Sequence, residues 1–263
     1  MPSTALVKDV LWRVSVKVLD TAPQFSRFSE RECVLFLGDA QVAVNKFVPT
    51  AAARTDTIKL APGTRQSIAQ IAPSDCKPSD GSTPTTPIRG TKLLAVRRNM
   101  GPDGFSPGAA IRPVDGLAQD MFDPEWHTRI GTTVKGVVAD PQTPTTFYVT
   151  PGAPPLTPVW VEVAMHAMPV QIPNTATVDA DGVHVSGVYG NGQSSTQTIT
   201  VSDEHVDDLV NYTVACLLMK ESKHADPAKA AVHARLFVES INAKVQAMTG
   251  KSPGLTTLPT ADR

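Results

Sequence analysis

Apolar residues recur at helical spacing near the start of the chain. Residues 4–19 carry an apolar residue at almost every third or fourth position, which predicts an amphipathic helix. A second helix is predicted to begin after Ser29, because Glu32 completes a capping box with it. Pro49 is expected to end this helix, since proline has no N–H group for the helical ladder.

Helical spacing returns near the end of the chain. Ser202 is predicted to cap a helix that begins with two acidic residues, which suit the positive end of the helix dipole. Asp226 followed by Pro227 is a typical helix start, and Gly250 is expected to end this last helix.

The middle of the chain alternates polar and apolar residues over short stretches, which predicts β-strands. These stretches are residues 57–60, 65–68, 92–98, 110–112, 133–138, 145–150 and 159–164. The first two are separated by a short turn and are therefore predicted to form a β-hairpin. Residues 72–90 are rich in proline and predict a loop, whereas residues 173–200 predict a projecting polar hairpin.

Four amphipathic helices cannot bury their apolar stripes separately, so the two helix pairs are expected to pack together. We therefore predict an α+β fold, in which a four-helix module built from the N- and C-terminal helix pairs carries an inserted antiparallel β region. The predicted parts are a discontinuous helical module, a β-rich domain with two insertions, and a flexible C-terminal tail: 1–50 with 201–250, 51–200 with insertions at 72–90 and 173–198, and 251–263.

Composition narrows the classes of function. The 263 residues include 24 basic and 25 acidic side chains, so no global charge attracts nucleic acid or an anionic membrane. The sequence has no long apolar run and no signal-peptide pattern, which predicts a protein made in the cytoplasm that does not bind membranes. The three distant cysteines, Cys33, Cys76 and Cys216, indicate neither a zinc module nor a disulfide framework.

The motifs of common enzymes are missing from the sequence, so we expect no catalytic residue, no cofactor and no metal site. The acidic cluster at residues 203–208 could in principle hold a metal, but carboxylates that complement the helix dipole explain it better. Glu125 with Asp123 or Asp120 is the compact carboxylate pair that a glycoside hydrolase would need, and helix capping again accounts for these residues more simply.

Arginines at residues 97, 98 and 112 form the densest basic region. Phosphate contact is one reading, and a strand edge protected by charge is the other. Aromatic residues make up only 5 % of the chain, which disfavours a platform for stacking bases. The candidate interface residues are Arg97, Arg98, Arg112, Trp126, Tyr189 and Asn191.

The order of several segments resembles the head–tail adaptor, or connector, proteins of tailed bacteriophages. It is also similar to the architecture of the tail-tubular and tail-accessory proteins of short-tailed phages. The resemblance covers most of residues 4–249 and departs at 72–90 and 173–198. It rests on Leu11-Trp12-Arg13-Val14, Ser29–Val48, Leu60–Gln66, Val96–Gly101, Ala110-Ile111-Arg112, Asp123–His127, Asp140-Pro141, Thr146–Pro151, Asp203–Lys223 and Asp226-Pro227-Ala228.

The resemblance implies a homo-oligomeric, dodecameric ring that binds beneath the portal protein, extends the DNA channel and docks a downstream tail or nozzle protein. Genomic DNA would pass through this channel without sequence-specific binding. The protein would be found in the neck or tail of the virion, and in the host cytoplasm during assembly. Residues 251–263 would reach the portal, and Arg97 and Arg98 would lie at a subunit or portal interface.

Other functions remain open at this point. Another neck or tail-completion protein would also form a ring but would bind tail subunits without the portal. A tail-associated peptidoglycan hydrolase would need two carboxylates in a cleft. A regulatory nucleic-acid-binding module is disfavoured because no basic recognition helix is predicted.

Overall fold

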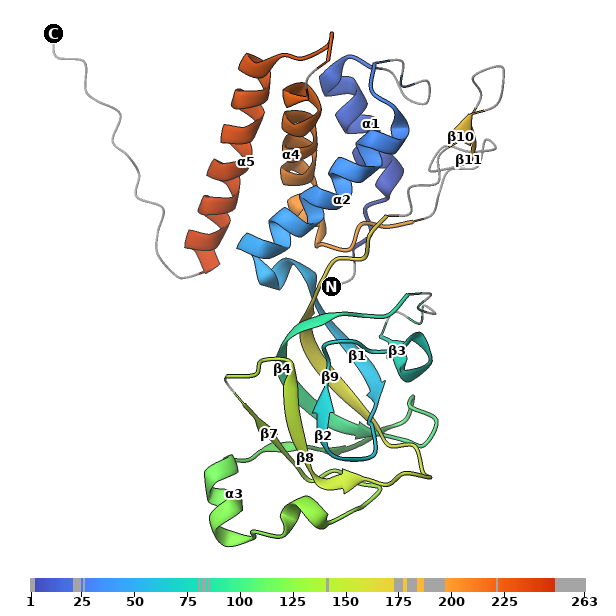
Figure 1. Cartoon of the computed structure of the whole chain (residues 1–263), viewed down its shortest axis with the longest axis vertical. Helices are drawn as coiled ribbons and strands as arrows, with labels where there is room; N and C mark the ends of the chain where they lie inside the picture. The colour runs from blue at the N-terminus through green and yellow to red at the C-terminus, as the bar shows by residue number, and fades with distance from the viewer. Residues whose placement is uncertain are drawn as a thin grey trace, which may run out of the picture. The chain divides into compact units, whose positions relative to one another are not determined.

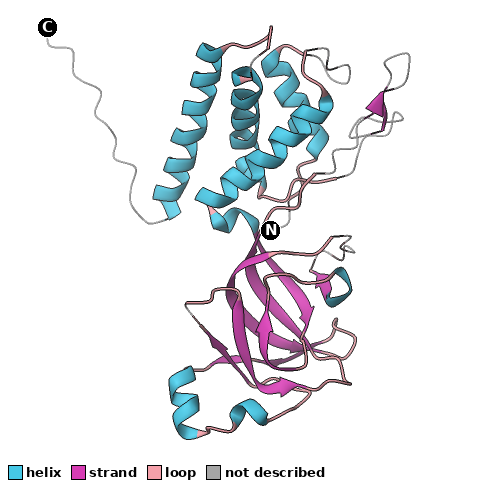
Figure 2. Cartoon of the chain, in the orientation of Figure 1, coloured by secondary structure: helices cyan, strands magenta, loops and turns pink. Residues whose placement is uncertain are grey.

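The computed structural model describes residues 3–20, 25, 27–79, 81, 84, 86–140, 142–172, 177–178, 184–186, 197–220 and 222–248. The chain divides into two compact units (Figures 1 and 2). The β-rich unit comprises the described residues of Ala52–Val170, and the helix-rich unit comprises Ser3–Ala51 together with the described residues from Gln171 onward.

The predicted fold class is wrong. The described residues form five α-helices, and nine strands of the β-rich unit form two sheets, so the chain is far richer in sheet than a four-helix module with an insertion. One helix, α3 (Gly116–Phe122), belongs to the β-rich unit. The β region is also not antiparallel throughout, because β6 (Arg112–Pro113) pairs with β7 (Gly136–Ala139) in parallel.

The two sheets have simple strand orders. The five-stranded sheet has the order β3-β1-β9-β4-β5, and its strands are β1 (Ala53–Lys59), β3 (Cys76–Pro78), β4 (Gly90–Met100), β5 (Pro107–Ala110) and β9 (Trp160–Ala167). The four-stranded sheet has the order β2-β8-β7-β6, and its remaining strands are β2 (Gly63–Ser67) and β8 (Thr146–Ala153). The register of β1 on β9 begins with Ala53 opposite His166.

The predicted hairpin at residues 57–68 is wrong, although both of its strands exist. β1 pairs with β3 and β9, whereas β2 pairs with β8 in the other sheet. The turn therefore carries the chain from one sheet to the other. Gln66 organises this corner, because its buried side chain accepts a hydrogen bond from the Ala61 N–H and donates to the carbonyls of Ala61 and Gly63. Gly63 has a φ of 97°, which favours glycine.

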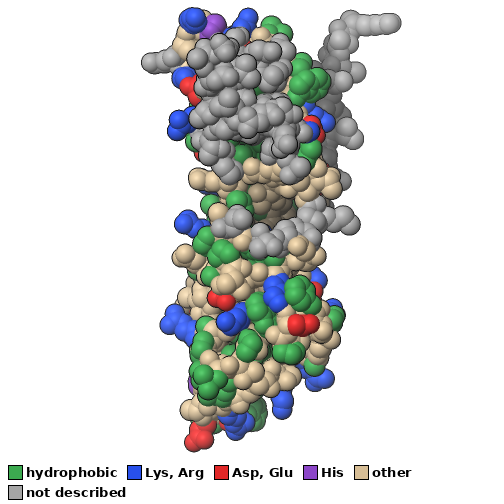
Figure 3. Space-filling view, turned by 90° about the vertical axis from the view of Figure 1, so that its right-hand side faces the viewer, with side chains coloured by type: hydrophobic (Ala, Val, Ile, Leu, Met, Phe, Trp, Pro, Cys, Tyr) green, Lys and Arg blue, Asp and Glu red, His purple; other side chains and the backbone are tan. Residues whose placement is uncertain are grey.

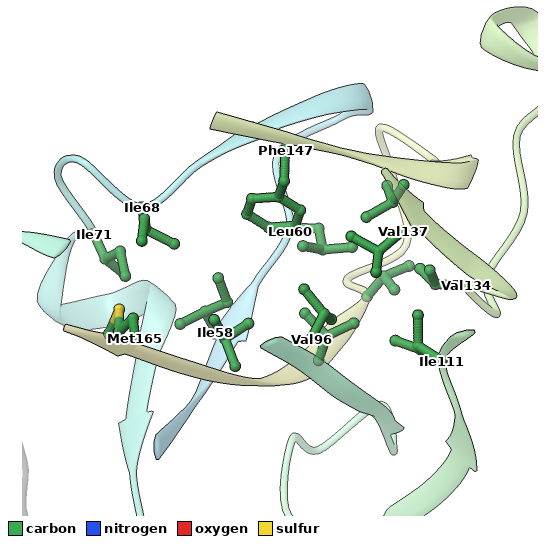
Figure 4. Packing of buried hydrophobic residues seen from close by; sticks show 14 of the residues in the cluster. Ile58, Leu60, Ile68, Ile71, Val96, Ile111, Val134, Val137, Phe147 and Met165 are labelled. Carbon is green, nitrogen blue, oxygen red and sulfur yellow. The ribbon is translucent and has the colours of Figure 1, made fainter. Parts of the chain in front are cut away.

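Apolar side chains from both sheets meet in one core (Figure 4). Phe147 on β8 has no exposed surface, and it lies opposite Ile58 and Val96 from the five-stranded sheet. Each sheet therefore has one face that water cannot reach, and this burial provides the main stabilisation of the unit.

Asn99 is a buried polar residue that joins three segments of the β-rich unit. Its amide nitrogen donates to the carbonyls of Ala109 (3.0 Å) and Val134 (2.7 Å), and its oxygen accepts from the Val134 N–H (2.8 Å). These three bonds satisfy backbone groups that the strand ladder leaves free.

Replacing Asn99 with alanine is expected to lower the free energy of unfolding by about 2 kcal/mol, because the Val134 N–H and two carbonyls lose their partner. Urea unfolding followed by circular dichroism measures the loss. Gln70→Ala, which removes an exposed side-chain amide in the same unit, is the control. An N99A chain as stable as this control would contradict the proposed bridging role.

The helix-rich unit is built around α4 (Val206–Met219), the most apolar of its helices. α1 (Val7–Val18), α2 (Glu30–Phe47) and α5 (Pro227–Met248) all pack against α4, and Figure 1 shows α4 between α5 and α1. Residues 197–199 pair with the chain just before α1, since the Val7 N–H donates to the Gln197 carbonyl.

The helix starts were predicted with mixed success. The capping box of Ser29 and Glu32 is confirmed, and the Asp226 side chain accepts from the Lys229 N–H at the start of α5. The prediction for Ser202 is wrong, because its hydroxyl donates to the Glu204 carboxylate and caps no backbone N–H among the described residues. A 3-10 turn over Asp203–His205 precedes α4 instead.

The predicted loop at 72–90 contains structure that the sequence pattern did not predict. A 3-10 turn over Pro73–Asp75 leads into β3, and Ile71 pairs with Ile88 across the segment. Most of residues 173–198 lie outside the described part of the chain. Among the few that are described, β10 (Thr177–Val178) pairs antiparallel with β11 (His184–Ser186). None of the helices in the described ranges is long and apolar enough to cross a membrane.

Candidate interaction surfaces

The short helix α3 presents apolar side chains to solvent. All seven of its residues are described and none is buried. Leu117, Met121 and Phe122 are 78 %, 80 % and 89 % exposed. Leu117 and Met121 lie one helical turn apart, so they share a face, and Phe122 is the last residue of the helix, next to Met121. Large apolar side chains grouped in this way are typical of a protein-binding surface.

Side chains at both ends of α3 define its position. The Asp115 carboxylate accepts from the Leu117 N–H at 2.9 Å and caps the helix. After the helix, Asp123 forms a bidentate ion pair with Arg129, at 2.7 and 2.8 Å. Gly116 is required at the first position, because a Cβ there would lie 2.8 Å from a methyl group of Val138.

Trp126 anchors the segment that follows α3. Its ring is only 2 % exposed, and its indole nitrogen donates to Asp120 on α3 at 2.7 Å. The ring stacks on His127 and meets Tyr148 of β8 edge-on. Trp126, one of the candidate interface residues, is therefore buried, and it supports the exposed helix α3 from beneath. We call Leu117, Met121 and Phe122 the α3 surface, and it is a firmly held apolar surface.

Of the predicted arginines, Arg97 and Arg98 lie on β4 of the five-stranded sheet, and Arg112 lies on β6 of the four-stranded sheet. Val96 pairs with Val163 and Arg98 pairs with Glu162, so Arg97 is an extra residue in a β-bulge. The carbonyl of Arg97 accepts a hydrogen bond from the Ile111 N–H. Arg112, the residue after Ile111, therefore lies near Arg97. Arg98 forms an ion pair with Glu162 (3.1 Å), while the side chains of Arg97 and Arg112 are exposed.

Tyr189 and Asn191, the two remaining interface candidates, lie outside the described residues. On the face that Figure 3 shows, the Lys and Arg side chains of the β-rich unit are interspersed with hydrophobic and neutral ones. A continuous basic track that would bind a nucleic-acid backbone is not visible in the described part of this face.

Asp203 ties the start of the described chain to the segment before α4. Its carboxylate accepts hydrogen bonds from the Ser3 and Thr4 hydroxyls and from the N–H groups of Thr4 and Ala5. These bonds hold the pKa of Asp203 at about 2, below the ordinary value of 3.8. The acidic cluster is therefore partly explained by a structural contact that the sequence pattern did not predict.

Asp203→Asn is expected to reduce the loss of stability that occurs as the pH falls from 3.8 toward 2. Because the folded pKa of Asp203 is lowered, the stabilisation is fully present above pH 3.8 and is lost as the pH falls toward 2. Melting temperatures measured across that window for wild type and D203N should converge at the acidic end. Asp39→Asn on the exposed face of α2 serves as the control, and parallel curves for wild type and D203N would contradict the assignment.

The other end of the acidic cluster is buried. Asp208 is 1 % exposed and accepts from Lys244 of α5 at 2.6 Å and from the fully buried His205 at 2.9 Å. Burial raises the pKa of Asp208, but the hydrogen bonds from His205, Lys244 and Ser240 outweigh it and lower the pKa below its usual value. This cluster links α4 to α5, so Asp208 is a buried ion-pair partner and not only a carboxylate that complements the helix dipole.

The carboxylates considered for catalysis have other partners. Asp120 binds Trp126 and Asp123 binds Arg129, while Glu125 is exposed. Among the described residues, no group of three or more His, Cys, Asp and Glu side chains could hold a metal ion. The structure therefore places the candidate residues in contacts that position α3.

The comparisons with known proteins leave the family open. No protein-family model matches the sequence, and no curated protein matches it.

Proposed function

We propose that this chain is a structural virion protein, a head-to-tail adaptor that forms a ring beneath the portal of a tailed bacteriophage, extends the DNA channel and docks the tail. The order of capped helices, strands and turns along the sequence supports this proposal by its resemblance to head–tail adaptors. The portal, a downstream tail or nozzle protein and further copies of the chain are the proposed partners.

The α3 surface is the observation that carries the proposal. Three large apolar side chains project from a helix whose ends are fixed by Asp115 and Asp123. Exposing such a surface has a cost in solubility, and a partner protein that covers it would remove that cost. A protein whose task is to join other proteins explains this surface better than a small-molecule reaction does.

Electron microscopy of the purified chain mixed with the portal ring of its phage tests the proposal. A collar added coaxially to one end of the portal is the expected result. Bare portal rings, with the chain stacked on tail proteins instead, would replace the adaptor with a neck or tail-completion protein. Binding to neither component would contradict an assembly role, and a zymogram on cell walls would then test hydrolysis.

Arg97→Glu is expected to weaken ring assembly or portal binding about tenfold, because the exposed Arg97 side chain is proposed to meet an acidic group across one of these interfaces. Cosedimentation with portal rings and sedimentation of the chain alone measure the two affinities. Arg65→Glu on β2 is the matched control for loss of an exposed arginine. Unchanged affinities in both assays would remove Arg97 from the interface.

A further inference from the structure

Strand β2 has a free edge. It stands at the end of the order β2-β8-β7-β6, so β8 is its one neighbour among the described strands. The Ile68 N–H, just after β2, donates to the Thr145 carbonyl on the β8 side, and backbone groups alternate in direction along an antiparallel strand. Gln66 therefore pairs with β8 as well, whereas the N–H and C=O groups of Arg65 and Ser67 point away from the sheet. No backbone hydrogen bond joins these four groups to a loop in the described ranges.

A groove with a volume of about 570 Å³ lies beside this edge. Exposed Arg65 and Ser67 of β2 line it on one side. The groove is also lined by Ile58, Leu60 and Ile71, whose side chains are buried and belong to the core of the unit (Figure 4). Unpaired backbone groups and an apolar interior are therefore next to each other, which is the combination that recognises an extended peptide.

Arg65 adds an uncompensated positive charge to this edge. Among the described residues it has no acidic partner at ion-pair distance, whereas Lys59, the other cation at the groove, pairs with Asp75 at 3.7 Å. A charge on an edge strand disfavours pairing with unrelated strands. It also favours a strand that carries an acidic residue opposite it. The charge of Arg65 therefore selects an acidic partner segment.

We propose that an extended segment of another protein binds as an added strand at the free edge of β2. The backbone of the segment pairs with the N–H and C=O groups of Arg65 and Ser67. Because successive side chains of a strand point to opposite faces, alternate apolar side chains enter the groove toward Ile58, and an acidic side chain on the other face pairs with Arg65. The inference goes beyond the adaptor function and does not depend on it, since it involves no ring or portal contact.

Selection of random peptides on the immobilised full chain, followed by amide hydrogen exchange measured by NMR, tests the proposal. In the free chain the Gln66 and Ile68 amides should be protected, and those of Arg65 and Ser67 should exchange fast. Peptides that bind at this edge should slow the exchange of Arg65 and Ser67 at least about tenfold. Their sequences should alternate apolar and polar residues and include an acidic one. If no selected peptide protects both amides, the proposal is overturned.

N-methylation of a selected peptide separates backbone pairing from other contacts. Only alternate N–H groups of an added strand face β2. Methylation of these groups should therefore weaken binding at least about tenfold, because each one removes a hydrogen bond, while methylation of the intervening N–H groups should have little effect. Fluorescence anisotropy of the labelled peptides measures the affinities. Equal effects of the two sets of methyl groups overturn strand addition.

Arg65→Glu tests the pairing of charges. The variant should bind the acidic peptide about tenfold more weakly, and replacing the acidic residue of the peptide with lysine should restore the affinity, because the ion pair is rebuilt with its signs reversed. Arg31→Glu, an exposed charge reversal on α2, is the control, and circular dichroism verifies that both variants are folded. An affinity that is indifferent to R65E overturns the acidic partner. Portal rings left bare by a chain that still binds the peptide contradict the adaptor function alone.

Discussion

Replacing Leu117, Met121 and Phe122 together with serine is expected to abolish docking of the partner protein that covers α3, while the fold of the chain is retained. All three side chains are largely exposed, so the free chain loses no packing. In a complex, each buried apolar side chain contributes about 1.5 kcal/mol or more, so the triple change weakens binding roughly 1,000-fold. Binding energy in interfaces is concentrated in a few such residues.

Cosedimentation of the triple variant with the partners named in the adaptor proposal, beginning with portal rings, measures this loss. Leu156→Ser is the matched control, because Leu156 is 94 % exposed in the same unit but lies apart from α3 in the sequence. Leu156→Ser should dock as wild type does. If the triple variant also docks normally to every component that wild type binds, the α3 surface is not the docking surface.

Lys244→Met is expected to destabilise the helix-rich unit by about 3 kcal/mol. The change keeps the length of the side chain but removes the positive charge that neutralises the buried Asp208 carboxylate. A buried charge that loses its partner costs far more than an exposed one. The pKa of Asp208 should rise in this variant, so the loss of stability should be smaller in acid, where the carboxyl becomes protonated.

Urea unfolding at neutral and acidic pH measures both effects, and Lys223→Met, an exposed lysine before α5, is the control. Adding Asp208→Asn to Lys244→Met should recover part of the lost stability, because no charge then remains buried. A double variant that is less stable than K244M by the full cost of D208N alone would show that Lys244 and Asp208 do not act together.

The helices were predictable where one local interaction decides the outcome. Ser29 with Glu32 and Asp226 with Lys229 are contacts within one helical turn, so neighbouring residues contain the whole signal. Ser202 failed because its hydroxyl had a competing acceptor in Glu204, and the residues that follow formed a 3-10 turn. Alternative local bonds of this kind are not distinguished by residue type.

Sheet pairing was harder to predict because it depends on distant residues. β1 and β2 look like a hairpin in sequence, yet β1 pairs with β9 and β2 pairs with β8, both far along the chain, and the side chain of Gln66 stabilises the corner between them. β4 contains a bulge at Arg97, which interrupts the alternation that would mark a strand with one buried face. For these reasons the sequence pattern predicted the β-rich unit only as an insertion in a four-helix module.

The α3 surface was missed for a related reason. The sequence pattern did not place Leu117, Met121 and Phe122 at the surface, because apolar residues in a short helix are normally buried in the core. The signal was present in the spacing of Leu117 and Met121. Only the structure shows that this face points to solvent, since the burial of Trp126 orients the segment.

The β-rich unit begins and ends at adjacent points, since Ala53 on its first strand lies opposite His166 on β9. A segment whose two ends lie side by side can be exchanged as a cassette, because any replacement with the same end separation closes the same gap in the host chain. Residues 52–170, and with them the α3 surface, can thus be exchanged while the helices that pack on α4 keep their sequence. The α3 surface can then change without altering the core of the helix-rich unit.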